Sequence, residues 1–307
     1  MKLPPLRALP VFEAVARLNS FSRAAAELAI TQSAVSHQIK QLEHYLGEPL
    51  FLRAGRHLSL TEEGRQYLDS VSSALMQIER ASEQLRGQDT ARLRLALFSS
   101  FAVRWLIPRL PALHRRHSDL QLVLEMTGDN PQLSDRIGDC FITIHRQSEA
   151  FTYEPLYRER LFPVCSRPFW RQWCDRLGTV PDQLTPAQLA TVPLLSTYSI
   201  YDREGEDWRQ WYAAAAETLA APVRMQHFSH MLLALEAARY HQGVVLTNDY
   251  MLGAEDDRDN FVRLPCHPLV TGDSFYFAYK TSRRNEPAIR QLRRWLLDEA
   301  AGSGLQA

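Results

Sequence analysis

The sequence predicts an α/β protein with a helical first part and a larger second part in which strands and helices alternate. Residues 1–60 have the composition of short helices joined by tight turns. Residues 61–88 contain no proline, and no glycine between Gly64 and Gly87, which predicts one long, nearly uninterrupted helix.

The alternation begins at Ala91. The apolar runs Leu93–Phe98 and Leu120–Glu125 are typical of strands, and the helical stretch 102–117 lies between them. Strands and helices at this spacing favour a largely parallel sheet. A final helix is expected from Pro287 to Glu299.

A helix-turn-helix pattern occupies the first part. A short helix over Phe21–Leu28 is followed by the turn 29–31, and Thr31 is a suitable N-cap for a second helix that ends near Leu46. One face of that second helix is an apolar stripe at steps of four, three and four: Val35, Ile39, Leu42 and Leu46. The opposite face is polar and mostly short, as expected for a helix lying in the DNA major groove: Gln32, Ser33, Ser36, His37 and Lys40.

A basic hairpin follows. Residues 50–60 resemble two short strands with Gly55 at the tip, and Arg53, Arg56 and His57 are suited to holding the DNA backbone or minor groove. The whole chain has 35 Lys and Arg against 35 Asp and Glu, so a nucleic-acid binder must concentrate its basic residues locally. Residues 1–57 have seven Lys and Arg against four Glu, a net of +3.

These residues resemble the winged helix-turn-helix of LysR-type transcriptional regulators almost position for position. The resemblance rests on Phe21–Ala25, Thr31–Ile39, Leu42-Glu43, Leu46-Gly47, Leu50-Phe51 and Leu60–Gly64. It implies double-stranded DNA with a dyad-symmetric promoter site as the partner. The expected DNA contacts are Ser22, Arg23, Gln32, Ser33, Ser36, His37, Lys40, Arg53 and Arg56.

The long helix has a heptad pattern. Apolar positions at alternating steps of three and four, broken once by serine, form a seam: Leu68, Val71, Leu75, Ile78, Ser82 and Leu85. The seam indicates a homodimer, which also fits a two-fold DNA site, and the alternative is a helix packed on its own domain. The family resemblance implies that such dimers associate again into tetramers.

Residues 91–307 resemble the two-lobed, periplasmic-binding-protein-like effector domain of the same family. The resemblance implies an effector cleft between lobe I (91–161 and 268–307) and lobe II (162–267), after the winged domain (1–60) and linker helix (61–90). The chain is expected to cross between the lobes near Arg160–Val164 and Leu264–Thr271.

Ser99 and Ser100 connect a strand to a helix, where hydroxyls and free N–H groups can bind a carboxylate. The resemblance adds five expected effector contacts: His145, Thr197, Tyr198, Ser229 and Thr247. Each of these positions also has a purely structural interpretation.

The chain is most similar in appearance to the branch of glycine-cleavage and D-serine-deaminase activators. Leu161–Ser166 and Phe228–His230 carry part of this likeness, and it implies an amino acid or similar small carboxylate as the effector. The sequence identifies no acceptor for an amino group, and Ser229 stands where many relatives have an aspartate.

Other function classes lack their motifs. The chain has no G-x-S-x-G, H-E-x-x-H, Walker or G-x-G-x-x-G pattern, so no enzyme, metal or cofactor is expected. No segment has the features of a membrane span or export signal, so a cytoplasmic protein without a membrane partner is expected. If the protein is an activator, RNA polymerase is a further expected partner. Two alternatives stay open: a regulator with no soluble effector, and one switched by oxidation of Cys140, Cys165, Cys174 or Cys266.

Overall fold

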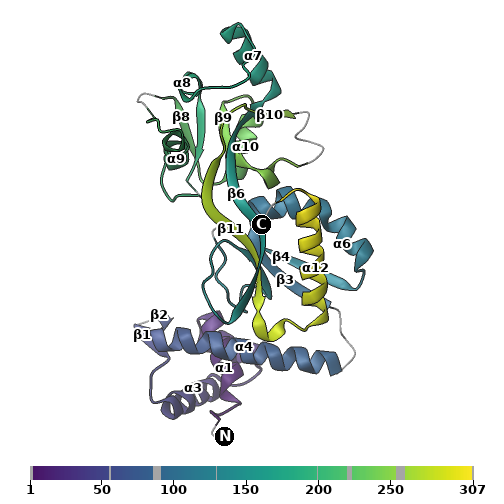
Figure 1. Ribbon diagram of the computed structural model, residues 1–307. Coiled ribbons are helices and arrows are strands. Elements are labelled where there is room, and N and C mark those ends of the chain that lie inside the picture. Colours follow the sequence, from purple (N-terminus) through teal and green to yellow (C-terminus); the bar gives the residue numbers. More distant parts are fainter. Residues whose placement is uncertain are drawn as a thin grey trace. The chain divides into compact units, whose positions relative to one another are not determined.

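The computed structural model describes residues 3–54, 57–85, 91–128, 130–198, 200–219, 223–253 and 260–305 (Figure 1). The chain divides into two compact units. The first comprises Met1–Thr90 with Leu133–Gly138, and the second comprises Ala91–Gln132 with Asp139–Ala307.

The first unit has the predicted helix-turn-helix with a hairpin. Its elements are α1 (Ala8–Leu18), α2 (Phe21–Glu27), α3 (Gln32–Leu46), β1 (Phe51–Ala54), β2 (His57–Leu60) and α4 (Glu62–Leu85). β1 and β2 are antiparallel, with Phe51 opposite Leu60. The expected hairpin tip, Gly55 and Arg56, lies outside the described residues.

Side-chain caps start both helices of the motif. Ser20 Oγ accepts a hydrogen bond from Arg23 N at 3.2 Å, and Thr31 Oγ1 accepts one from Ala34 N at 3.2 Å. Between the helices the chain turns through Ala29, whose φ of +53° is in the left-handed region. The predicted cap, turn and helix are confirmed.

The apolar stripe of α3 closes the core of this unit. Val35, Ile39 and Leu42 are at most 1% exposed and pack in one cluster with α1 and the hairpin, where the Phe12 and Phe51 rings meet edge to face at 5.6 Å. Burial of such side chains stabilises the unit by about 1.5–3 kcal/mol each.

The long helix is confirmed as α4, although the expected heptad seam is not one continuous surface. Leu68 and Val71 are 2% and 4% exposed because they pack into the core of their own unit, and Leu75 packs against that core. Ile78, one turn further, is 65% exposed. The first half of the predicted seam therefore packs on the core of its own unit, which is the alternative that the sequence left open.

The second unit is built on one sheet. Among the described residues its strands are β3 (Ala91–Phe98), β4 (Leu120–Thr127), β5 (Cys140–Thr143), β6 (Phe151–Ser166), β7 (Leu194–Thr197), β8 (Met225–Phe228), β9 (Val244–Asn248), β10 (Phe261–Arg263) and β11 (Leu269–Lys280). The spatial order is β4-β3-β5-β11-β6-β9-β7-β8, with β10 beside β6.

The prediction of a largely parallel sheet is only half right. β3 is parallel to β4 and β5, and β7 is parallel to β8 and β9. The long strands β6 and β11 are antiparallel to each partner they have and connect the two parallel groups. The result is one sheet with both parallel and antiparallel strands, in an α/β domain with two lobes (Figure 1).

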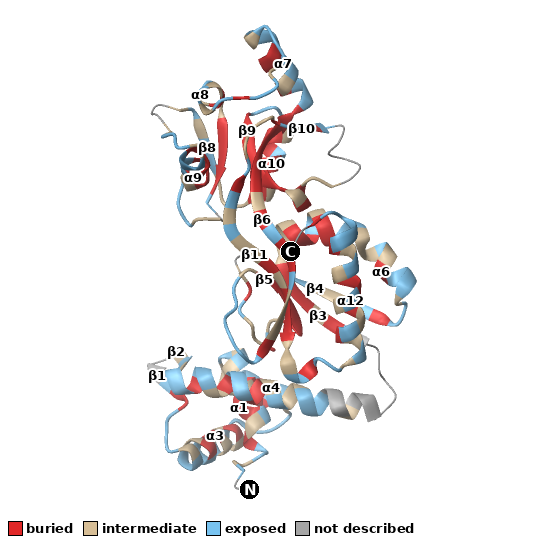
Figure 2. Cartoon of the chain, in the orientation of Figure 1, coloured by how far each residue is buried: buried red, intermediate tan, exposed pale blue. Residues whose placement is uncertain are grey.

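Helices cover the sheet and enclose a buried core (Figure 2), and many of its side chains are aromatic. They are α5 (Ser99–Phe101), η1 (Ala102–Leu106), η2 (Ile107–Arg109), α6 (Leu110–Arg116), α7 (Arg167–Leu177), α8 (Pro186–Leu189), α9 (Glu206–Ala214), α10 (Met231–Arg239), η3 (Asp249–Met251), η4 (Thr281–Arg283) and α12 (Pro287–Gly302). Trp105, Trp208, Trp211 and Trp295 are at most 1% exposed. Within the described part of the chain, no helix is both long and apolar enough to cross a membrane.

Candidate functional sites

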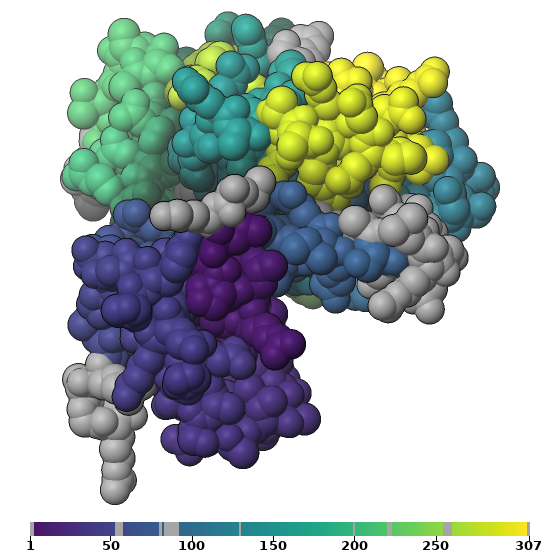
Figure 3. Space-filling view, turned by 90° about the horizontal axis from the view of Figure 1, so that it is seen from below, coloured from purple at the N-terminus to yellow at the C-terminus, as the bar shows by residue number. Residues whose placement is uncertain are grey.

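The polar face of α3 is available to a partner. Gln32, Ser33, His37 and Lys40 are exposed, and Ser36 is half-buried. Because the apolar stripe of α3 packs into the core, the polar face on the opposite side of the helix points to solvent. Figure 3 shows the surface of this unit in purple and dark blue. The face therefore has the donors and acceptors that can contact base edges and phosphates.

Several of these side chains are already oriented by neighbours. Ser22 Oγ donates to Gln32 Oε1 at 3.2 Å, which connects the start of α2 to the start of α3. Ser33 Oγ lies 2.9 Å from the capping hydroxyl of Thr31. Arg23 is exposed, and its guanidinium donates to the carbonyl oxygen of Leu18.

The remaining predicted DNA contacts are on the hairpin. The backbone of Arg53 is in β1, paired with Leu58, but its side chain is outside the described residues. Arg56 is not described at all.

In the second unit, one group of predicted effector residues follows the strands of the first parallel group. Ser99 and Ser100 come directly after β3, and His145 comes two residues after β5. Because carboxyl ends of parallel strands meet at one edge, these residues share an edge of the sheet.

The other group lies at the corresponding edge of the second parallel group. Thr197 ends β7 opposite Phe228 of β8, so Ser229 follows at the same level. Leu195 of β7 is opposite Val245 of β9, and the two strands are parallel. Two residues further along each strand, Thr197 and Thr247 are therefore at the same level.

Three contacts join the two edges. His230 Nε2 lies 3.3 Å from the carbonyl oxygen of Gly128, which follows β4. Ser100 Oγ lies 3.2 Å from the hydroxyl of Tyr250, and Arg104 Nε donates to Met251 O at 2.9 Å. The strand ends of both parallel groups therefore face a common region.

The predicted effector residues differ in accessibility within this region. Ser99, Ser100 and Ser229 are half-buried, while His145 and Tyr198 are exposed. Thr197 and Thr247 have no exposed surface, and the Thr247 hydroxyl points to Met231 Sδ at 3.6 Å.

The sequence interpretation missed a buried polar group beside these residues. Glu159 of β6 is 6% exposed, and Asn248 Nδ2 donates to its Oε1 at 2.9 Å. Burial raises the pKa of Glu159 to about 7. The sequence did contain a signal for a buried polar group here, because Asn248 follows the apolar run Val244–Leu246 after a single threonine.

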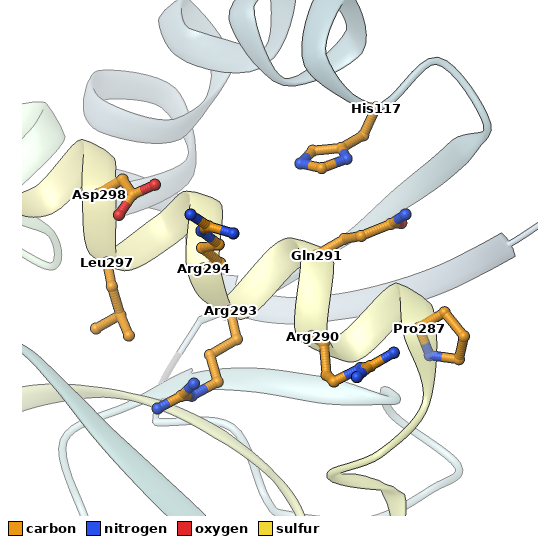
Figure 4. A pocket seen from close by; sticks show the side chains of 8 residues that line it. All are labelled: His117, Pro287, Arg290, Gln291, Arg293, Arg294, Leu297 and Asp298. Atoms are coloured by element: carbon orange, nitrogen blue, oxygen red, sulfur yellow. The ribbon is translucent and has the colours of Figure 1, made fainter.

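A basic pocket of about 590 Å³ lies elsewhere in this unit (Figure 4). His117 follows α6, and the other lining residues are all on α12: Pro287, Arg290, Gln291, Arg293, Arg294, Leu297 and Asp298. Asp298 is paired with Arg116 at 3.2 Å. None of the predicted effector residues lines this pocket.

Three of the four cysteines have little exposed surface. Cys140, Cys165 and Cys174 are buried, Cys266 is half-buried, and none of the four is in a disulfide within the described residues. Burial raises the pKa of Cys165 and of Cys266 to about 12, so few thiolates form near neutral pH. Among the described residues, no group of three or more His, Cys, Asp or Glu is arranged to hold a metal ion.

A winged helix-turn-helix joined to a two-lobed α/β domain defines a DNA-binding transcriptional regulator. Residues 6–65 match the family described as "Bacterial regulatory helix-turn-helix protein, lysR family", and residues 86–301 match the "LysR substrate binding domain". The chain therefore belongs to the LysR-type transcriptional regulators, and it is a regulator rather than an enzyme.

Curated relatives support the expected branch. The chain is 34% identical over 302 residues to the glycine cleavage system transcriptional activator of Escherichia coli K12, covering 98% of this chain and 95% of the relative. It is 33% identical to the transcriptional activator AmpR of Pseudomonas aeruginosa, covering 97% and 96%.

Solved structures share the fold. ArgP from Mycobacterium tuberculosis has a TM-score of 0.70 at 23% identity, covering 98% of both chains. Full-length LysG from Corynebacterium glutamicum with bound effector Arg has a TM-score of 0.65 at 18% identity, covering 97% of this chain and 98% of that one.

Proposed function

We propose that this LysR-type regulator is controlled by a small carboxylate, such as an amino acid, bound where the strand ends of the two lobes meet. The supporting observation is the set of cross-contacts, above all Ser100 Oγ at 3.2 Å from Tyr250. The contact joins the start of α5 to η3 after β9, so a ligand there touches both lobes.

The half-buried hydroxyls of Ser99, Ser100 and Ser229 are the preferred carboxylate ligands, because they lie at strand ends and keep some exposure. His145 and Tyr198 would contribute from the exposed rim. Thr197 and Thr247 would contact the effector only after a local rearrangement, since both are 0% exposed.

We also propose that the lobe limits are 91–161 with 268–307, and 162–267. Both long strands support this division, because β6 and β11 are the segments that connect the parallel groups. An effector that contacts both lobes can regulate only by binding two domain arrangements with different affinity.

The DNA-bound form is proposed to be a homodimer on a dyad-symmetric site, with tetramers formed from two dimers. Ile78, 65% exposed on α4, is available for pairing between copies. Gln32, Ser33, Ser36, His37 and Lys40 would contact DNA along α3, with Ser22, Arg23, Arg53 and Arg56 at its borders. Contact with RNA polymerase belongs to the proposal if the protein activates transcription.

The effector proposal is tested by thermal unfolding of the full-length protein with L- and D-amino acids and small carboxylates. A ligand at 100 times its Kd stabilises the folded state by about 2.7 kcal/mol. Ser282 is an exposed serine of η4 and serves as the control. At least one compound is expected to raise Tm for wild type and for Ser282→Ala, and not for Ser100→Ala. A panel without effect on wild type, or an undiminished response of Ser100→Ala, would contradict the proposal.

A further inference from the structure

Glu159 lies where the two connecting strands lose their register. Arg158 of β6 is opposite Ser274 of β11, and Arg160 is opposite Val270. Two steps on β6 therefore correspond to four on β11. Residues 271–273 of β11 stand opposite Glu159 alone, two residues more than a regular ladder has, and they form a bulge there. Gly272 at the middle of the bulge has a φ of +89°.

Within the described residues, the donors to the carboxylate of Glu159 are neutral. Asn248 Nδ2 donates to Oε1 at 2.9 Å, and Thr271 Oγ1 donates to Oε2 at 3.2 Å. Among the described residues no Lys, Arg or His acts on this carboxylate, and the one charge that does is the carboxylate of Asp273. The neighbouring Arg160 is paired with Asp249 instead. A buried carboxylate without a cation costs free energy unless a cation or proton neutralises it.

A second acceptor is unpaired at the same place. Asn248 is 0% exposed, and its Oδ1 has no hydrogen-bond partner in the described structure. The amide is fixed by its bond to Glu159, so the unpaired oxygen belongs to the same group of polar atoms. A buried acceptor without a donor is rare in folded proteins and costs about 1–3 kcal/mol.

The surroundings favour positive charge. Burial raises the pKa of Asp273, and the nearby His145 acts on it in the opposite direction. Burial and the charges of Glu159 and Asp273 raise the pKa of Tyr201 to about 12. These shifts indicate an interior rich in acceptors and poor in cations.

This group of acceptors is connected to the proposed carboxylate site. The side-chain amide of Asn248 acts as a hydrogen-bond donor toward the Tyr250 hydroxyl, since it lowers the pKa of that group, and this hydroxyl lies 3.2 Å from Ser100 Oγ. A small zwitterion that binds at both Ser100 and Glu159 would lie along these side chains. It would need a local rearrangement, as at Thr197 and Thr247, because Asn248 is 0% and Glu159 is 6% exposed.

We propose that Glu159 and Asn248 Oδ1 bind a cationic amino group of the effector, so that the effector is an amino compound and not a simple carboxylate. The assignment rests on the proposed effector site and makes it more specific. An ammonium group has three N–H donors, which suits Glu159, Asn248 Oδ1 and one further acceptor. It would also neutralise the carboxylate that the fold leaves without a cation.

The competing explanation is that Glu159 is simply a protonated structural side chain. The test compares each amino acid that stabilises full-length wild type with the same molecule lacking the amino group, for example alanine with propionate. Binding is measured by isothermal titration at pH 8 for wild type, Glu159→Gln and Glu154→Gln. Glu154 is a matched control, since it is on the same strand and its carboxylate is paired with Arg293 and Tyr279.

The expected result is that the desamino analogues bind at least tenfold more weakly, and that Glu159→Gln loses at least tenfold in affinity while Glu154→Gln keeps it. A cooperative thermal unfolding transition of Glu159→Gln is also required, so that lost affinity is not due to misfolding. Equal binding of amino and desamino compounds, or unchanged affinity in Glu159→Gln, would overturn the assignment and leave the carboxylate site standing. If no compound binds wild type, both proposals fail.

Discussion

Replacing Glu159 by glutamine should change how stability depends on pH. The glutamine side chain would imitate the protonated carboxyl group at every pH, and a flipped Asn248 amide could use its unpaired Oδ1 to accept from the new side-chain amide. The pKa of Glu159 is about 7 in the folded protein, against an ordinary value of 4.5. The folded state therefore binds more protons than the unfolded state between these two values.

The sign follows from that difference. Stability contributed by the bound proton is complete below about pH 4.5 and is lost as pH rises through about 7. The interval between 4.5 and about 7, at about 1.4 kcal/mol per pH unit, sets an upper limit of about 3 kcal/mol. Glu159→Gln should consequently be more stable than wild type at pH 8, by about 1–3 kcal/mol, and close to wild type at pH 4.5.

Urea unfolding of the ligand-free protein at a series of pH values measures this difference. The six tryptophans all lie between Trp105 and Trp295, so their fluorescence reports on the second unit alone. Glu154→Gln is the control with the opposite sign, because the hydrogen bond from Arg293 lowers the pKa of Glu154 and its loss should destabilise at pH 8. If the free energy of unfolding changed with pH in the same way for wild type and Glu159→Gln, the reasoning would be refuted. Glu159 would then titrate alike in the folded and unfolded states.

The other predictions concern the first unit and the thiols. Thr31→Ala should destabilise the first unit by about 1 kcal/mol through loss of the α3 cap, measured by circular dichroism, and an unchanged midpoint would contradict the cap's role. Ser33→Ala should lower affinity for the specific site more than for random DNA, whereas Arg53→Ala should weaken both and reduce the salt slope by about 0.9 in titrations at several salt concentrations. Equal losses on both DNAs for Ser33→Ala would exclude base contact by that residue. Ile78→Glu should shift sedimentation toward monomer without lowering Tm, and an unchanged oligomer would place the contact between copies elsewhere. Millimolar peroxide should leave DNA affinity and thiol count unchanged at pH 7, because burial raises the pKa of Cys165, Cys174 and Cys266 and Cys140 is buried. Loss of thiols with altered affinity would restore the oxidative switch.

Local signals in the sequence were sufficient for the DNA-binding unit. The Thr31 cap, the stripe at Val35, Ile39 and Leu42, and the short turn before them are all encoded within about one helix length. The periodicity alone predicts which face of α3 packs inward. The structure has each of these features where the pattern placed it.

Predictions of what packs against an element were less reliable than predictions of the element itself. The heptad seam of α4 gives no indication that Leu68 and Val71 pack on their own unit while Ile78 stays exposed, because periodicity identifies an apolar face and not what covers it. In the same way, alternating strands and helices indicated a parallel sheet. The antiparallel courses of β6 and β11 follow from their role in connecting two parallel groups.

The sequence by itself determined the family and the polar face of α3, since each depends on neighbouring residues or on a long matching motif. Only the tertiary structure brought Glu159, Asn248, Tyr250 and Ser100 together from β6, β9, η3 and α5. No local pattern can encode such a group, because its members are far apart in the chain. In the described part of the chain Glu159 has no cation beside it and Asn248 Oδ1 has no donor, because the folded strands bury both groups.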